Sequence, residues 1–366
     1  MKLPPPKEHY AVAVVGAGAI GLDHISSFQS HPLAHVAAVA EVSAERGRHA
    51  AEQFGIREVT SDNRELLGRD DIDIFSIALP NHLHATVALA ALRAGKHVML
   101  EKPMTTDAQS AQRVADESRR RGLLLIVGQN DRFSGEVQTA RQLVEKGALG
   151  EVYHARTYWM RRSGIPRIGS WFTQRKFAGG GCVYDIGVHA LDRCLFLMGE
   201  FDAAAVSGQV FGKFGPRGLG EGNWGKGEVD RRKPFDVDDF ATALIRLRSG
   251  RTVYLQASWA AHQASADCNS TELFGTDAGL SLRPLRLLRP VRRGYLSEEV
   301  RQLPNLVDAN RMVHFIDCLL GRAEPYVNVS ESLAVQRILD AIYRSALTGR
   351  EVRLRPAASK RSSRTP

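Results

Sequence analysis

The apolar stretch Tyr10–Val15 (YAVAVV) runs directly into the glycine-rich stretch Gly16–Gly21 (GAGAIG). The apolar run predicts a buried strand, and the glycines predict a turn into a helix. Gly16 permits the tight turn, Gly18 lets the backbone approach a pyrophosphate, and Gly21 lets the helix pack closely on the strand. Unpaired N–H groups at the start of that helix favour phosphate groups. The stretch therefore predicts a dinucleotide-binding turn.

An acidic residue follows this turn at the distance that a dinucleotide needs. Glu41 lies twenty residues after Gly21, and there its carboxylate would accept hydrogen bonds from the adenosine ribose hydroxyls. Its negative charge would repel a 2′-phosphate, so we expect NAD as the cofactor. Because Arg46 and Ser43 follow closely, NADP stays open as the less favoured alternative.

Length and composition describe a globular protein with two domains. The chain has 366 residues, of which 43% are apolar and 24% charged, and these fractions are ordinary for globular proteins. No apolar run approaches the roughly 20 residues that span a bilayer, and the first residues lack the apolar stretch of a secretory signal. Four scattered cysteines without a CxxC pair favour reduced thiols. We expect a cytoplasmic protein with no membrane partner.

The formal net charge of +9 is concentrated locally. Several arginines lie between residues 283 and 293, and further lysines and arginines lie in the Ser/Pro-rich end of the chain. Neither segment interleaves aromatic residues with the charges, and no nucleic-acid-binding motif accompanies them. We therefore expect a solvated basic surface, a disordered basic tail over residues 356–366, and no nucleic-acid partner.

The pattern of elements changes near residue 130. Before it, short apolar strands such as Ile74–Ala78 alternate with helical stretches such as Thr86–Ala94, which predicts a parallel sheet covered by helices on both faces. After it, longer β-type segments joined by turns predict a mostly antiparallel sheet of the α+β class. We expect a nucleotide-binding domain over residues 1–130 and a second domain over residues 131–355.

Three ionisable residues lie where a site is expected. Lys102 follows a predicted strand, and the carboxyl ends of parallel strands are where such sheets bind ligands. Asp185 and His189 are four residues apart, so on an α-helix they share one face and the carboxylate could orient the imidazole as a general base. A structural acid and a core histidine remain the alternative. Because no third or fourth ligand can be placed, we expect no metal.

Four motifs in this order, GAGAIG, PNHLH, EKP and GGGCVYDIGVH, give the chain its resemblance to a known family. It resembles the glucose–fructose oxidoreductase, inositol dehydrogenase and rhizopine-catabolism (Gfo/Idh/MocA) family over roughly residues 10–350. The resemblance implies an α/β N-terminal Rossmann domain followed by an α+β domain with one large, mostly antiparallel open sheet. It also implies a homo-oligomer, either a homodimer or a homotetramer, assembled through the back of that sheet.

The resemblance also assigns roles to individual residues. It implies Lys102, Asp185 and His189 as catalytic residues that also bind substrate. Further substrate-binding positions would be Arg132, Arg162 and Trp171. The implied cofactor-binding residues are Gly16, Gly18, Ala19, Ile20, Gly21, Glu41, Arg46, Pro80, Asn81, His84, Glu101 and Lys102. Two departures are small: Leu79 replaces a commoner threonine, and a glutamate replaces an aspartate at position 41.

The implied reaction is the NAD-dependent oxidation, or reverse reduction, of a secondary hydroxyl on a sugar, sugar derivative or cyclitol. His189 would take the hydroxyl proton, Asp185 would orient the imidazole, and Lys102 would stabilise negative charge on the reacting oxygen. A glycosidase that holds NAD tightly and acts by transient oxidation and elimination is an alternative from another class. A catalytically inactive cofactor-binding regulator is a third.

Overall fold

Six parallel strands form the first sheet of the computed structural model, which describes residues 3–224 and 229–356. They lie in the order β3-β2-β1-β4-β5-β6, so the order reverses between β1 and β4. Open sheets of this kind bind ligands at such a reversal, outside the carboxyl ends of the strands. The strands are Tyr10–Val15 (β1), Ala34–Ala40 (β2), Glu58–Thr60 (β3), Ile74–Ile77 (β4), His97–Leu100 (β5) and Leu125–Val127 (β6).

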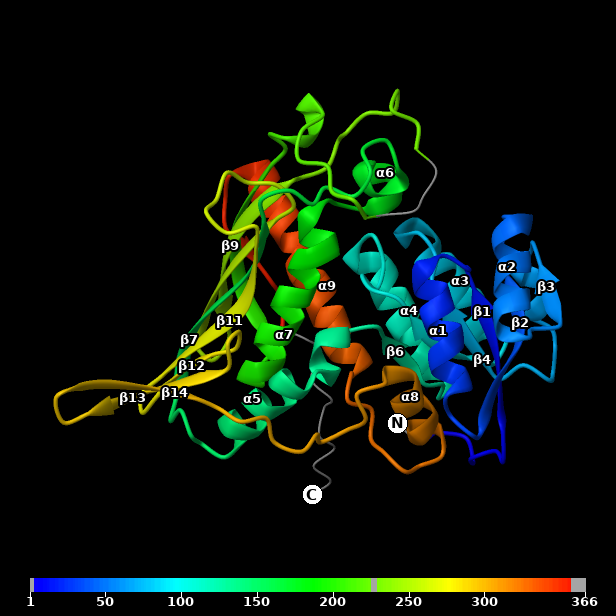
Figure 1. Ribbon diagram of the computed structural model, residues 1–366, viewed down its shortest axis with the longest axis horizontal. Coiled ribbons are helices and arrows are strands. Elements are labelled where there is room, and N and C mark those ends of the chain that lie inside the picture. Colours follow the sequence, from blue (N-terminus) through cyan, green and yellow to red (C-terminus); the bar gives the residue numbers. More distant parts are fainter. Residues whose placement is uncertain (1–2, 225–228, 357–366) are drawn as a thin grey trace, which may run out of the picture.

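Helices pack around this sheet (Figure 1). Every residue of β1 is buried, as its continuous apolar sequence predicts for a strand covered on both faces. The helices of this part are Ala19–Gln29 (α1), Ala44–Phe54 (α2), Asn81–Arg93 (α3) and Ala108–Arg121 (α4), with a short 3₁₀ turn at Asn63–Leu66.

Nine strands form the second sheet, in the order β14-β13-β12-β11-β7-β10-β9-β8-β15. Strands β7 and β10 pair in parallel, and the other neighbours pair antiparallel. The expected fold class is therefore confirmed. The strands are Val152–Arg161 (β7), Ala203–Phe211 (β8), Phe240–Leu247 (β9), Thr252–Ser258 (β10), Asp267–Gly275 (β11), Gly279–Ser281 (β12), Arg286–Val291 (β13), Gly294–Glu299 (β14) and Val352–Arg353 (β15).

One face of the second sheet carries the helices and the other does not (Figure 1). Helices α7 (Val188–Met198) and α9 (Val329–Thr348) pack on the face that turns toward the first domain, and α5 (Gly135–Glu145) packs on α7. Burial alternates along β9 accordingly, because successive side chains point to opposite faces. The face without helices exposes apolar side chains such as Leu244.

Late in the chain, helix α8 (Arg311–Leu319) returns to the first domain. Its Phe315 is fully buried in one cluster with Val12 and Phe28, and the Phe315 ring meets Phe28 edge-on. The core of the nucleotide-binding part therefore includes a helix from far outside residues 1–130. The predicted tail lies outside the described residues from residue 357 onward. Within the described ranges, no helix has the length and apolar character to cross a membrane.

Candidate active site

The glycine-rich turn has the shape that a pyrophosphate requires. Gly16 has φ +96°, and a Cβ at Gly21 would collide with the carbonyl oxygen of Gly16, so both positions need glycine. A Cβ at Gly18, in contrast, would meet no atom within 4 Å. Helix α1 begins at Ala19 without a side-chain cap, and Ile20 is exposed. The turn thus offers helix N–H groups beside open space, and these residues fit a dinucleotide phosphate.

Glu41 directly follows β2, and hydrogen bonds hold its carboxylate in place. One oxygen accepts from the Ala17 N–H at 2.8 Å, and the other accepts from the Ser43 N–H at 2.9 Å and from Arg46 Nη2 at 2.7 Å. Burial alone would raise the pKa of Glu41, but these hydrogen bonds outweigh it and lower the pKa. The group is therefore an anion at neutral pH, as a ribose-binding carboxylate must be.

Three of the predicted cofactor-binding residues, Pro80, Asn81 and His84, lie at the start of α3. Pro80 is the N-cap of α3, and Asn81 donates from Nδ2 to the Ala178 carbonyl at 2.8 Å, which joins the two domains. His84 is fully buried, with each ring nitrogen 2.8 Å from a backbone carbonyl. In this structure His84 therefore offers no free ring nitrogen to a cofactor, because Nδ1 faces the Pro103 carbonyl and Nε2 faces the Leu79 carbonyl.

Glu101 also differs from its predicted role. Its buried carboxylate contacts His24 Nε2 at 3.0 Å and Arg311 Nη1 at 2.6 Å. Burial opposes the charge, but the Arg311 guanidinium and His24 hold the pKa of Glu101 well below its usual range. Glu101 thus belongs to an ion cluster beneath the site rather than to a surface that a cofactor could contact. Arg311 reaches it from α8, far along the sequence.

Lys102 and Asp185 meet across the two domains. Lys102 Nζ lies 3.0 Å from both the Oδ1 atom and the carbonyl oxygen of Asp185. The other carboxylate oxygen accepts from Trp259 Nε1 at 2.8 Å. Burial alone would raise the pKa of Asp185, but the charge of Lys102 and the bond from Trp259 lower it. Trp259 lies outside every motif of the sequence and was missed.

His189 is the second residue of α7, and its ring lies beside that of Trp159 at a centroid distance of 5.8 Å. Its Nδ1 is buried and has no hydrogen-bond partner among the described residues. Burial and the nearby charge of Lys102 lower the pKa of His189 to about 4. The imidazole is therefore neutral at pH 7 and able to accept a proton.

The predicted pairing of Asp185 with His189 requires correction. Asp185 lies in a π-helical turn, Val183–Gly187, rather than in a regular α-helix. Both of its carboxylate oxygens are engaged, one by Lys102 and one by Trp259. Asp185 therefore orients Lys102 in this structure. Its carboxylate oxygens bind Lys102 and Trp259 rather than the imidazole of His189.

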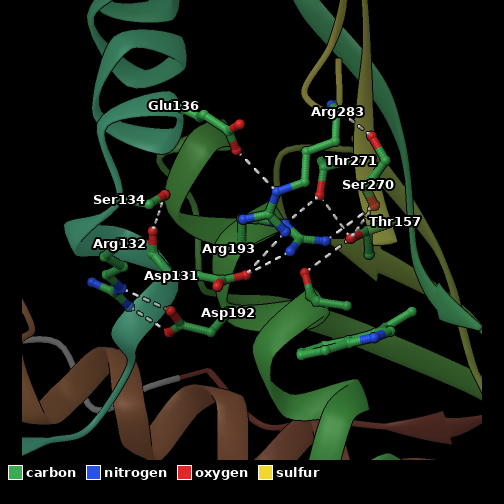
Figure 2. A network of polar contacts seen from close by, with 12 residues as sticks. Asp131, Arg132, Ser134, Glu136, Thr157, Asp192, Arg193, Ser270, Thr271 and Arg283 are labelled. Carbon is green, nitrogen blue, oxygen red and sulfur yellow. Dashed lines mark hydrogen bonds and ion pairs between the residues drawn. The ribbon is translucent and has the colours of Figure 1, made fainter. Parts of the chain in front are cut away.

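Arg132 is not available to a substrate. Its guanidinium is fully buried, donates to both Asp192 carboxylate oxygens at 2.6 and 2.8 Å, and pairs with Glu331 at 2.5 Å. Figure 2 shows the bidentate contact with Asp192. In this structure the guanidinium of Arg132 therefore offers no free donor to a substrate, because two carboxylates already engage it.

The remaining predicted substrate residues lie toward the solvent. Arg162 is exposed and donates to the backbone carbonyls of Gln263 and Ala264. Trp171 stacks on Phe172 with a centroid distance of 3.8 Å. Their contact with substrate stays a prediction. The sequence reading also missed Arg161, whose guanidinium lies over the Trp159 ring at 4.7 Å.

Two family models match the chain. Residues 10–129 match the model of the oxidoreductase family with an NAD-binding Rossmann fold, and residues 137–281 match the GFO/IDH/MocA C-terminal domain. The chain is 28% identical to the D-glucoside 3-dehydrogenase of Escherichia coli (strain K12) over 94% of this chain and 97% of that protein.

A second relative is a levoglucosan dehydrogenase of Pseudarthrobacter phenanthrenivorans, 31% identical over 74% of this chain and 72% of that protein. Among solved structures, levoglucosan dehydrogenase in complex with NADH and levoglucosan has a TM-score of 0.79 at 25% identity, covering 94% of this chain and 99% of that one. The chain belongs to the GFO/IDH/MocA family, and it is an NAD-dependent oxidoreductase.

Proposed function

We propose that this protein is an NAD-dependent dehydrogenase that oxidises a secondary hydroxyl of a sugar, sugar derivative or cyclitol, or reduces the corresponding ketone. The observation that carries the proposal is that Lys102 Nζ lies 3.0 Å from Asp185 Oδ1 in a chain with a dinucleotide-binding turn, and that burial and the charge of Lys102 keep His189 neutral. Relatives named as dehydrogenases of a D-glucoside and of levoglucosan support this substrate class.

Each polar group at the site has a distinct task in this reaction. Bound NAD supplies the hydride acceptor. The neutral imidazole of His189 accepts the hydroxyl proton. The Lys102 ammonium donates a hydrogen bond to the reacting oxygen and stabilises the negative charge that develops there. Asp185, bonded to Trp259, holds the ammonium in place.

A substrate screen tests the proposal directly. Sugars, glycosides and cyclitols are incubated with the protein and NAD, and NADH is followed at 340 nm. We expect net NADH to accumulate with at least one sugar or cyclitol. Release of an aglycone from a nitrophenyl glycoside without net NADH would instead indicate the glycosidase alternative, and no reaction with any member would contradict the proposal.

The carboxylate of Glu41 predicts which dinucleotide binds. It is an anion fixed beside Arg46 at 2.7 Å, and it would repel a 2′-phosphate. We expect fluorescence titration of the wild-type protein to show tighter binding of NAD than of NADP. Glu41→Ser removes the charge and should shift the preference toward NADP.

The nearby Glu45→Gln is the matched control, because Glu45 is exposed in the first turn of α2. It removes one negative charge without touching Ala17 or Ser43, so its preference should stay that of the wild type. Tighter NADP binding by the wild type would contradict the role given to Glu41.

We expect a homodimer or homotetramer that associates through the sheet face without helices. That face exposes 37% of Phe211, 36% of Leu244 and 37% of Phe274, and an apolar area of this kind favours association. At one edge of the sheet, the β13–β14 hairpin projects from the molecule (Figure 1), with Tyr295 79% exposed. Light scattering at micromolar concentration should give a multiple of the 40.3 kDa chain mass.

Leu244→Glu should weaken this association, because it replaces an exposed apolar side chain of this face with a charge. Leu347→Glu is the matched control, since Leu347 is 86% exposed on α9, away from the sheet face. A wild-type mass of one chain would contradict the expectation.

All four cysteines are thiols, which supports our proposal of a cytoplasmic location.

A further inference from the structure

One carboxamide on the inner face of the second sheet has no partner. Asn269 lies in β11, and its Oδ1 atom is buried without a hydrogen-bond donor among the described residues. Buried polar atoms in proteins are nearly always hydrogen-bonded, so an acceptor left alone needs an explanation. A site that awaits a ligand is one such explanation.

The neighbours of Asn269 along β11 are all satisfied. Two residues before it, Asp267 accepts from Trp159 Nε1 at 3.1 Å and from Arg161 Nε at 3.3 Å. Two residues after it, Thr271 Oγ1 meets Thr157 Oγ1 at 2.8 Å and accepts from Arg193 Nε at 2.9 Å. Within this row of inward-facing polar side chains, Asn269 is the exception.

The contact of Arg193 with β11 fixes the position of His189. Arg193 lies in α7 and also donates to the Ser270 carbonyl at 3.1 Å, as Figure 2 shows. Four residues earlier on the helix, about 6 Å away along its axis, is His189. Asn269 lies two residues before Thr271, the other β11 residue that Arg193 contacts, and therefore roughly 6.7 Å from it along the strand.

Helix α7 and strand β11 run in the same direction here, so these two steps lead to the same level. The register confirms it, because Asn269 pairs with Trp159, whose ring lies 5.8 Å from the ring of His189. Thr157, two residues before Trp159, donates to the Ala190 carbonyl at 3.0 Å and ties β7 to the helix. Asn269 is therefore placed at the level of the imidazole that would accept the substrate proton, with Trp159 as the neighbour of both.

We propose that Asn269 is a substrate-binding residue whose carboxamide binds a second hydroxyl, on the carbon next to the one that is oxidised. The hydroxyl would donate its O–H to Oδ1 and so supply the donor that this buried acceptor lacks. The substrate class narrows accordingly to vicinal diols, as in sugars and cyclitols whose neighbouring hydroxyl is free. This inference rests on the proposed function and adds a specificity residue to it.

The test compares hydroxylated substrates with analogues that lack one hydroxyl. The probes are methyl α-D-glucopyranoside, levoglucosan and myo-inositol, each with its monodeoxy analogues, and kcat/KM is measured with NAD. For the wild type, we expect removal of the hydroxyl next to the reacting carbon to lower kcat/KM about 10- to 100-fold, because Oδ1 is left unpaired.

Asn269→Ala should lose a similar factor on the parent substrate and no longer distinguish it from that analogue. Asn269→Asp retains an acceptor and should keep part of the discrimination. The matched control is Gln53→Ala, which removes an exposed carboxamide near the end of α2 in the first domain. All three variants should bind NAD like the wild type and show an unchanged unfolding midpoint.

Two outcomes overturn the inference in different ways. If the wild type is active but Asn269→Ala still distinguishes parent and analogue as the wild type does, Asn269 does not bind the second hydroxyl, and the proposed dehydrogenase function stands. If no parent probe yields NADH, the proposed substrate class fails and the inference falls with it.

Discussion

His189→Ala is expected to lower turnover by about 10² to 10⁴-fold, the usual contribution of a positioned general base. The imidazole lies against Trp159 in the second domain, whereas the turn at Gly16–Gly21 and Glu41 lie in the first. NAD affinity should therefore stay close to that of the wild type. The measurement combines kcat on a substrate from the screen with NAD titration by fluorescence.

The pH profile gives this prediction a second readout. Burial and Lys102 lower the pKa of His189 to about 4, and the proton acceptor must be neutral. Oxidation should therefore persist as the pH falls through 6.5, the ordinary histidine value, and decline only near pH 4. The control variant is His9→Ala, at an exposed position of the N-terminal segment, and its turnover and pH profile should match those of the wild type. Near-wild-type turnover in His189→Ala would remove the general base from the mechanism.

Lys102→Met should cause a loss of comparable size, about 10² to 10³-fold in kcat, because a charge aimed at the reacting oxygen disappears. Two neighbours should respond as well. The charge of Lys102 lowers the pKa of both Asp185 and His189, so both pKa values should rise in the variant. The acid limb of the residual activity should accordingly move upward from about pH 4.

Lys146→Met is the matched control, since Lys146 is exposed at the end of α5 and its loss should leave kcat and the pH profile unchanged. NAD affinity should also be nearly unchanged in Lys102→Met. A variant that keeps wild-type kcat, or an acid limb that stays near pH 4, would show that the Lys102 ammonium does not act beside His189.

Short-range patterns predicted much of the nucleotide-binding part. The strand at Ile74–Ala78 was expected within one residue of β4 (Ile74–Ile77), because a continuous apolar run between turns has few other stable states. The helix expected at Thr86–Ala94 begins five residues earlier, at Asn81. Pro80 explains the difference, since a proline is well placed at a helix start and Asn81–Ala85 carry no residue that breaks a helix.

The candidate site was predicted less completely, because its contacts join distant parts of the chain. Arg132 was placed at the substrate, yet Asp192 and Glu331, 60 and 199 residues away, enclose it. Asp185 was expected to orient His189, yet Trp259, 74 residues away, and Lys102 engage its carboxylate. No local sequence pattern predicts which distant residue will pair with a buried charge.

The sequence by itself determined the dinucleotide turn, the alternation of strands and helices, and the identity of Lys102 and His189 as candidate catalytic groups. These features follow from backbone constraints and from patterns between near neighbours in the chain. Only the tertiary structure decided that Asp185 binds Lys102 and that Asn269 pairs with Trp159, whose ring lies next to that of His189. Those facts depend on the register of β11 against β7 and on helix packing, and side-chain pairing across such contacts is set when the whole sheet forms.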